Sequence, residues 1–362
     1  MNLAAHRLHN QRLIGTPLGT PAAAVQWLGA VQAQDFSGAK WALALRTRST
    51  HAALDRAFNT GAFLRTHVMR PTWHLVVPAD LRWLLALTSP RVHAVNGHVY
   101  RKLQLDNTVF RRAHSIFIAA LQGGRARTRQ ELAESLEAKG IPARGQRLAY
   151  IVMHAELSAL LCSGPPRGKQ HTYALLEERV PPVPSLTREE ALGTLARRYF
   201  TSHGPATLSD FAWWSGLTVA DAKAGLSLIG SEVAPVALGE KTYWTAAPVG
   251  AVGLDTPIVH LLPNYDEHVV AYRDHGPSLH PAALGAMRSR TDGPLDAHLI
   301  VRDGLVVGGW RRRMEKGVAI LAVDPLVKLR REERAALERA AGDYGTFVGM
   351  PVQVKPIGSL RV

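Results

Sequence analysis

One supersecondary pattern recurs along this chain: a capped helix, a turn, a second helix and then a hairpin. In the clearest copy, Thr128 and Glu131 have the spacing of a capping box and open a helix that stops at Gly140. A second helix is predicted over residues 146–160, and residues 161–176 have the pattern of a hairpin with a basic Gly/Pro tip. This order of elements is typical of a winged helix.

A further copy is predicted over residues 185–247. Thr207 and Thr218 each stand three residues before an aspartate, which is the spacing of a helix cap, so two short helices are expected. A hairpin follows over residues 233–244. The stiff stretch Pro-Pro-Val-Pro at residues 181–184 links this copy to the one before it.

A looser copy is predicted at the start of the chain. Three helices are expected there, followed by a hairpin that turns at residues 69–71. The helices are expected near residues 3–13, 21–31 and 50–60, and the two strands at residues 63–68 and 72–77.

The C-terminal part changes character, because strands separated by Asp-Gly and Lys-Gly turns replace most of the helices. Strands are predicted at residues 259–262, 298–302, 305–311, 318–323 and 351–356, with an amphipathic helix at residues 330–342. These elements predict a small β-barrel or curled sheet.

Together the patterns predict an α+β fold in which three tandem winged helices surround a small C-terminal β-barrel. We expect this arrangement to be C-shaped, with a basic cleft. The expected domains are residues 1–110, 111–182 and 183–250, one winged-helix region each, and residues 251–362, the barrel region.

The charge of the chain favours a polyanionic partner. It has 43 Lys and Arg residues against 29 Asp and Glu, a formal net charge of +14. Each phosphate that such a surface neutralises releases a condensed counterion, which favours binding. The charge would therefore suit DNA, RNA or an anionic membrane surface as a partner. Because no apolar run reaches transmembrane length, we expect a cytoplasmic, nucleoid-associated protein with no membrane partner.

Residue usage argues against metals and cofactors. The single cysteine, Cys162, allows neither an intramolecular disulfide nor a Cys-rich metal site, and the 16 histidines form no H-x-x-x-H pair. No Walker motif or G-x-G-x-x-G follows a predicted strand. We therefore expect no metal and no cofactor.

Gln32 and Gln34 are the candidates for chemistry. They stand two residues apart, so an extended chain would direct both carboxamides to one side, where they could hold one water molecule. An amide is a poor general base, but a purine alkylated at N7 is already cationic and leaves without help. The protein would then only position water and offer carbonyl dipoles to the oxocarbenium-like sugar. The alternative is a helix end that is capped by polar groups.

Residues 31–35, Val-Gln-Ala-Gln-Asp, resemble the Q-Φ-Q catalytic signature of the AlkZ/YcaQ-type winged-helix DNA glycosylases, whose YcaQ-like members carry Q-Φ-D instead. With glutamine at both positions, the chain is closer to the AlkZ type. Arg70-Pro71 stands where the family usually has a glycine, so the local geometry of that turn departs from the pattern. Four further segments are similar to the family and occur in its order: residues 69–76, 203–211, 261–266 and 304–310.

The resemblance implies tandem winged helices around a β-barrel, and activity on N7-alkylguanine that includes the unhooking of interstrand crosslinks. It also implies that Gln32 and Gln34 position the attacking water. We therefore expect a monomeric glycosylase whose partner is double-stranded DNA with alkylated or crosslinked purines. Monofunctional hydrolysis is expected, because nothing near Lys40, the closest lysine, suggests an activated amine.

Four residues are candidates for a supporting role, each with a structural alternative. Asp35 could act as a base or shield the oxocarbenium ion, but it could also cap the next helix. Tyr265 and Asp266 follow a predicted strand, where Asp266 could hold a base or water or could form a turn. His74 lies on the same strand face as Arg70, and this face could line a cleft or be half-buried in a sheet.

Basic residues at predicted hairpins are candidates for DNA contact. A hairpin tip commonly reaches the backbone or the minor groove of DNA, where arginine is well suited. The alternative is a charged turn that only contacts solvent. The predicted DNA-binding residues are Arg70, Arg167, Lys169, Arg311, Arg312, Arg313 and Lys316.

Two other functions fit the charge and the repeats. A non-catalytic winged-helix transcription regulator would bind undamaged duplex selectively and release no base. An RNA-binding scaffold would prefer single strands, for which an aromatic content of 7% gives little support.

Overall fold

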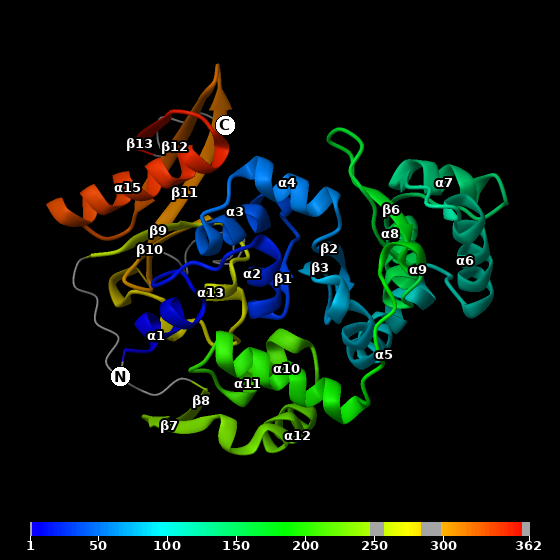
Figure 1. Ribbon diagram of the computed structural model, residues 1–362, viewed down its shortest axis with the longest axis horizontal. Helices are drawn as coiled ribbons and strands as arrows, with labels where there is room; N and C mark the ends of the chain where they lie inside the picture. Colours follow the sequence, from blue (N-terminus) through cyan, green and yellow to red (C-terminus); the bar gives the residue numbers. More distant parts are fainter. Residues whose placement is uncertain (1, 247–256, 284–297, 357–362) are drawn as a thin grey trace.

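Three units with the same order of elements make up most of the protein (Figure 1). The computed structural model describes residues 2–246, 257–283 and 298–356. In each unit a helix precedes a short strand or β-bridge, two further helices follow, and a hairpin ends the unit. The first unit comprises α2 (Pro21–Leu28), β1 (Val31–Gln32), α3 (Phe36–Thr47), α4 (His51–Asn59), β2 (Leu64–Val68) and β3 (Arg70–Val76).

The second and third units repeat this order and its strand pairing. The second comprises α6 (Asn107–Leu121), β4 (Arg127–Thr128), α7 (Arg129–Glu137), α8 (Gly145–Leu157), β5 (Leu161–Ser163) and β6 (Thr172–Leu175). The third comprises α10 (Arg188–Ser202), α11 (Leu208–Ser215), α12 (Val219–Ile229), β7 (Ala234–Leu238) and β8 (Lys241–Thr245). The strand orders β1-β3-β2 and β4-β6-β5 place the last strand in the middle, and β8 lies likewise between β7 and Ala206.

Helix caps set these boundaries, and several were predicted correctly. Full capping boxes are present at Thr128, Thr207 and Thr218, where each threonine side chain accepts a hydrogen bond from the backbone N–H three residues on. Gly216 ends α11 in the left-handed conformation, with φ of 70°. The three predicted hairpins are also confirmed.

The prediction for the first unit was wrong in two places. The helix expected up to residue 31 ends at Leu28, because Gly29, with φ of 79°, turns the chain so that β1 can begin. Residues 36–47, which were not expected to be helical, form α3. The N-terminal helix α1 (Leu3–Asn10) precedes the unit and is not part of the repeat.

A long helix, α5 (Pro78–Lys102), joins the first unit to the second. No helix was predicted there, and Pro90, a residue that disfavours the interior of a helix, lies inside it. The predicted domain limit at residue 110 lies within α6. Short helices complete the described chain: α9 (Leu176–Arg179), α13 (Glu267–Val270), η1 (Gly230–Glu232), η2 (Gly276–Ser278) and η3 (Pro281–Ala283).

The C-terminal strands form one five-stranded sheet in the order β13-β12-β11-β10-β9. Within the described ranges this sheet has two free edges, β13 and β9, so it is open, unlike the predicted barrel. Its strands are antiparallel except for β13, which pairs with β12 in parallel. The elements are β9 (Val259–Leu262), β10 (His298–Arg302), β11 (Leu305–Glu315), β12 (Val318–Pro325), α15 (Arg331–Val348) and β13 (Val352–Pro356).

The hydrophobic clusters place the first unit at the centre of the molecule. One cluster joins β2 and β3 to α5 and to the helices of the third unit. Another joins α2, α3 and α4 to the C-terminal sheet and α15. The second unit has a cluster of its own, built from α6, α7 and α8. Strand β1 therefore lies where the first unit, the third unit and the C-terminal sheet meet (Figure 1).

Among the described residues, no helix combines the length and the apolarity that crossing a bilayer requires.

Candidate active site

Gln32 is the last residue of edge strand β1, and Gln34 follows two residues later. Gln32 pairs with His74 of β3, and the N–H of Ala33 donates to the carbonyl of Trp73 at 2.7 Å, so the segment is extended as the sequence analysis supposed. Gln34 lies beyond this pairing, in the bend that leads to α3. Gln32 is 7% exposed, whereas Gln34 is an exposed residue.

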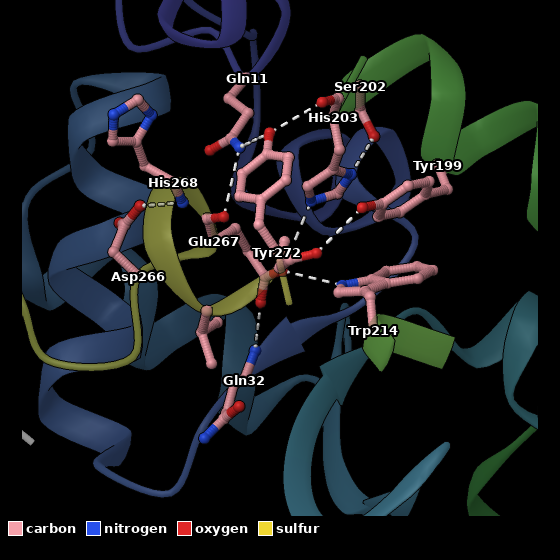
Figure 2. Close-up of polar contacts among 12 residues, drawn as sticks. Gln11, Gln32, Tyr199, Ser202, His203, Trp214, Asp266, Glu267, His268 and Tyr272 are labelled. Atoms are coloured by element: carbon pink, nitrogen blue, oxygen red, sulfur yellow. Dashed lines mark hydrogen bonds and ion pairs between the residues drawn. The ribbon is translucent and has the colours of Figure 1, made fainter. Parts of the chain in front are cut away.

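Gln32 is held at both its backbone and its side chain. Its backbone N–H donates to Oε1 of Glu267 at 2.8 Å, and Nη2 of Arg70 donates to its side-chain oxygen, Oε1, at 2.9 Å. Figure 2 shows the carboxamide of Gln32 directed away from the group of residues around Glu267. The backbone of Gln32 is thus anchored to one element and its side chain to another.

Glu267 is the central buried carboxylate of this region, and the sequence analysis missed it. Its side chain is fully buried, and Oε2 accepts a hydrogen bond from Nε1 of Trp214 at 2.9 Å and lies 3.4 Å from Nε2 of His203 (Figure 2). Its carbonyl accepts a hydrogen bond from Gln11. Glu267 therefore connects β1 of the first unit with helices α10 and α11 of the third.

Asp266, predicted as a supporting residue, is placed in a structural role. Its carboxylate is completely buried and accepts two hydrogen bonds from Arg46, at 2.9 and 2.8 Å. It also caps α13 by accepting from the N–H of His268 at 2.9 Å. These donors leave it inaccessible to a substrate. Tyr265 is half-buried beside it, in the left-handed conformation with φ of 60°.

Asp35 is the N-cap of α3, which is the structural alternative given for it above. Its Oδ1 accepts from the N–H of Gly38 at 3.0 Å, and its Oδ2 lies 3.7 Å from Nη2 of Arg312. A Cβ atom at Gly38 would lie 2.9 Å from the carboxylate of Asp35 and 3.1 Å from Oδ1 of Asn264, so glycine is required there. Asn264, in the loop between β9 and α13, is therefore a close neighbour of the site.

His74 is a neutral, fully buried side chain on the strand beside Gln32. Its Nδ1 donates to the carbonyl of Thr72 at 3.0 Å, since a carbonyl can only accept. Burial, reinforced by the charge of Arg70, holds the pKa of His74 well below its usual value. Its Nε2 and the hydroxyl of Thr72 are buried without a partner in the part of the chain that the structure describes.

The tip of the β5–β6 hairpin lies against the start of α3. His171, just before β6, packs edge-on against Phe36, with ring centroids 4.9 Å apart. Arg167 and Lys169 lie at this tip and are exposed; Arg167 also contacts Glu131 at 2.8 Å. Two of the predicted DNA-binding residues therefore lie on the hairpin that contacts Phe36.

The second basic group lies on β11 and in the turn after it, and its member Arg312 lies near Asp35. Arg312 is largely buried between Asp35 and the hydroxyl of Tyr344, to which it donates at 3.2 Å. Arg311, Arg313 and Lys316 are exposed. Arg70, in contrast, is directed at Gln32 inside the fold and belongs to neither basic group.

Sequence reasoning could have found part of what it missed. Asn264 lies inside the segment 261–266 that resembles the family. Only its titratable neighbours, Tyr265 and Asp266, were predicted as site residues. Glu267 follows directly, and its contacts with β1 and α11 join segments more than 50 residues away, which no local pattern reveals. Arg65, whose Nε donates to the carbonyl of Ala33 at 3.0 Å, was missed for the same reason.

Within the described ranges, no group of three or more His, Cys, Asp and Glu side chains could hold a metal ion. Cys162 is buried, and burial raises the pKa of its thiol to about 12, so it is unreactive near neutral pH.

Comparison with known proteins identifies a family. Residues 25–347 match the family model described as DNA glycosylase AlkZ-like. The structure of the Streptomyces sahachiroi DNA glycosylase AlkZ is similar, with a TM-score of 0.77 and 22% sequence identity over 98% of each chain. A search of curated proteins found no match.

Proposed function

Because this chain belongs to the AlkZ-like family of DNA glycosylases, we propose that it hydrolyses the N-glycosidic bond of N7-alkylated purines in double-stranded DNA. The substrates include purines that crosslink the two strands. Water held by Gln32 and Gln34 is the nucleophile.

One observation carries this proposal: the two glutamines are the neutral polar groups at and just after the end of β1, while the neighbouring carboxylates of Asp35 and Glu267 are engaged with other groups. Asp35 caps α3 and lies near Arg312, so it is not needed to explain catalysis. Two carboxamides suffice when the leaving purine is already cationic, because positioning water and placing carbonyl dipoles near the sugar lower the barrier.

The surroundings of Lys40 support monofunctional hydrolysis. A lyase reaction would need a free amine to attack the sugar. Nζ of Lys40 lies 2.7 Å from both Asp55 and Nε2 of His51, and the side chain is only 8% exposed. This amine is therefore engaged by two partners and is not a free nucleophile.

The two basic groups support binding of duplex DNA across the end of β1. The β5–β6 hairpin and strand β11 flank Asp35, and both carry exposed cations. A crosslinked base cannot be flipped into a closed pocket without dragging its partner strand, so crosslink unhooking needs an accessible site. The exposure of Gln34 supports such an open site. The order of elements in the three units supports tandem winged helices. We propose that the protein acts as a monomer.

A base-release assay tests the proposal. Duplex DNA with a single N7-methylguanine is incubated with the protein and cleaved at abasic sites with alkali. We expect strand cleavage with the unaltered protein and none with Gln34→Ala, whose affinity for the duplex stays unchanged. Gln130→Ala, a substitution of an exposed glutamine on α7, is the matched control and should retain activity. Full turnover by Gln34→Ala would refute the glutamine mechanism, and no turnover by any form would favour a non-catalytic DNA-binding protein.

A further inference from the structure

The contact between Arg70 and Gln32 makes the two glutamines unequal. An arginine side chain has only hydrogen-bond donors, so the oxygen of the Gln32 carboxamide, and not its nitrogen, must face Nη2 of Arg70. The opposite end of the carboxamide is then the NH2 group. Within the described part of the chain this Nε2 has no hydrogen-bond partner, and it is not among the fully buried polar atoms.

We propose that Arg70 is a positioning residue that fixes the polarity of Gln32, so that Gln32 donates a hydrogen bond to the attacking water and Gln34 accepts one from it. This inference rests on the proposed glycosylase function and assigns different roles to the two glutamines. It also replaces the expectation that Arg70 contacts DNA.

The surroundings of Arg70 allow it to hold this orientation. Its guanidinium lies 5.7 Å from the centre of the Trp213 ring, in the wall of a cavity of about 230 Å³ formed by the β2–β3 turn, α5 and the end of α11. A Cβ atom at Gly216 would lie 2.1 Å from the carbonyl of Met69, so the end of α11 packs directly on the turn that precedes Arg70. The third unit therefore holds Arg70 in place.

Glu267 compensates the charge that Arg70 brings near the reaction. Burial lowers the pKa of the Arg70 guanidinium, but the negative charge of Glu267 opposes this effect and arginine stays protonated. Because Glu267 also binds the backbone N–H of Gln32, one carboxylate both fixes the strand and offsets the cation beside the oxocarbenium-like sugar.

The division of roles gives a balanced hydrolysis. The bond between C1′ of the sugar and the purine nitrogen breaks, and its electron pair neutralises the cationic purine as it leaves. One lone pair of the water accepts from Gln32, one hydrogen is donated to Gln34, and the remaining lone pair forms the new bond to C1′. Since neither amide can take the proton, it passes to bulk water at the exposed Gln34.

A double-mutant cycle between Arg70 and Gln32 tests the inference. Single-turnover base release, duplex affinity and thermal unfolding are measured for Arg70→Met, Gln32→Ala and the double variant. We expect Arg70→Met to slow base release by about 10- to 100-fold, the loss of one charge-assisted hydrogen bond. Its affinity for DNA should stay unchanged, and it should cause no further loss in the Gln32→Ala background. Arg91→Met, which removes an exposed arginine from the same cavity, is the matched control and should act like the unaltered protein.

Additive losses in the cycle would overturn the inference, as would weaker binding of Arg70→Met with a shallower salt dependence, which would identify a phosphate contact. If Arg70→Met does not fold, three other variants test the inference. They are Arg70→Lys and the isosteric pair Gln32→Glu and Gln34→Glu. Gln32→Glu loses the donor and should be inactive, whereas Gln34→Glu keeps the acceptor and should retain activity; equal effects would contradict the assignment. Full activity of both alanine variants, Gln32→Ala and Gln34→Ala, would instead refute the proposed water mechanism itself.

Discussion

Arg46 and Asp266 form two parallel hydrogen bonds, Nη1 to Oδ2 at 2.9 Å and Nη2 to Oδ1 at 2.8 Å, between side chains that are both fully buried. The pair joins α3 to the N-terminus of α13, the helix whose first residue binds the backbone of Gln32. The position of the candidate site therefore depends on this ion pair.

We predict that Asp266→Asn lowers the free energy of unfolding by about 3–5 kcal/mol, because it leaves the buried guanidinium of Arg46 uncompensated. Urea unfolding at pH 7 measures the change. Glu232→Gln removes the carboxylate of an exposed pair with Arg197 and should leave the stability unaltered within error. A change at Asp266 no larger than that of this control would contradict the structural role.

Because several histidines are buried, we predict that the free energy of unfolding falls in mild acid. Burial is the main cause that lowers the pKa of His268 to about 4 and that of His298, which also lies near Arg312, to about 4. Above pH 6.5 these rings are neutral in the folded and the unfolded chain, so the protein has its full stability there. As the pH falls from 6.5 toward 4, only the unfolded chain takes up protons, and each histidine costs about 1.4 kcal/mol per pH unit.

Urea unfolding between pH 7.5 and 4.5 checks this direction. His298→Asn removes one such group, so the decline with acidification should be shallower for this variant. His98→Asn, at an exposed histidine of α5, is the matched control and should leave the decline unchanged. A protein that gains stability on acidification over this range would show that the sign is wrong.

The role of Asp35 can be separated from catalysis. If it only caps α3, Asp35→Ala should lower the free energy of unfolding by about 1 kcal/mol and leave base release nearly unchanged. Asp35→Ser keeps a cap and removes the carboxylate, so it should restore the stability. Loss of base release in both variants, with the stability of Asp35→Ser intact, would instead identify the carboxylate as catalytic.

Local patterns predicted α7, α8, α11, α12 and both hairpins of the second and third units, because their helix caps and hairpin turns lie within a few residues of each other. The capping boxes at Thr128 and Thr218 are of this kind. The first helix of each unit, α6 and α10, was not predicted. In the first unit the same reasoning missed α3, although capping of a helix was the alternative given for Asp35. The apolar residues before Gln32 extended the predicted helix across Gly29, where the chain actually turns.

The site was predictable only where its residues lie close together in the sequence. Gln32 and Gln34 were found from one short segment, and the extended conformation that their chemistry needs is observed up to Ala33. Glu267 lies 235 residues from Gln32, and a pairing of this length depends on how the third unit packs on the first. Arg70 was predicted to contact DNA because its partner, the side chain of Gln32, lies 38 residues before it and no local pattern joins the two.

The exposed cations that flank Asp35 should contribute to DNA affinity rather than to chemistry. We predict that Lys169→Ala and Arg311→Ala each weaken duplex binding and reduce the slope of log affinity against log salt by about 1, since each removes one phosphate contact. Base release at saturating protein should be unchanged, because neither residue contacts a glutamine. Arg339→Ala, at an exposed position of α15, removes the same charge away from both basic groups and should leave the slope as it is. Equal slopes for all three variants would mean that the duplex does not cross the end of β1 between the β5–β6 hairpin and β11.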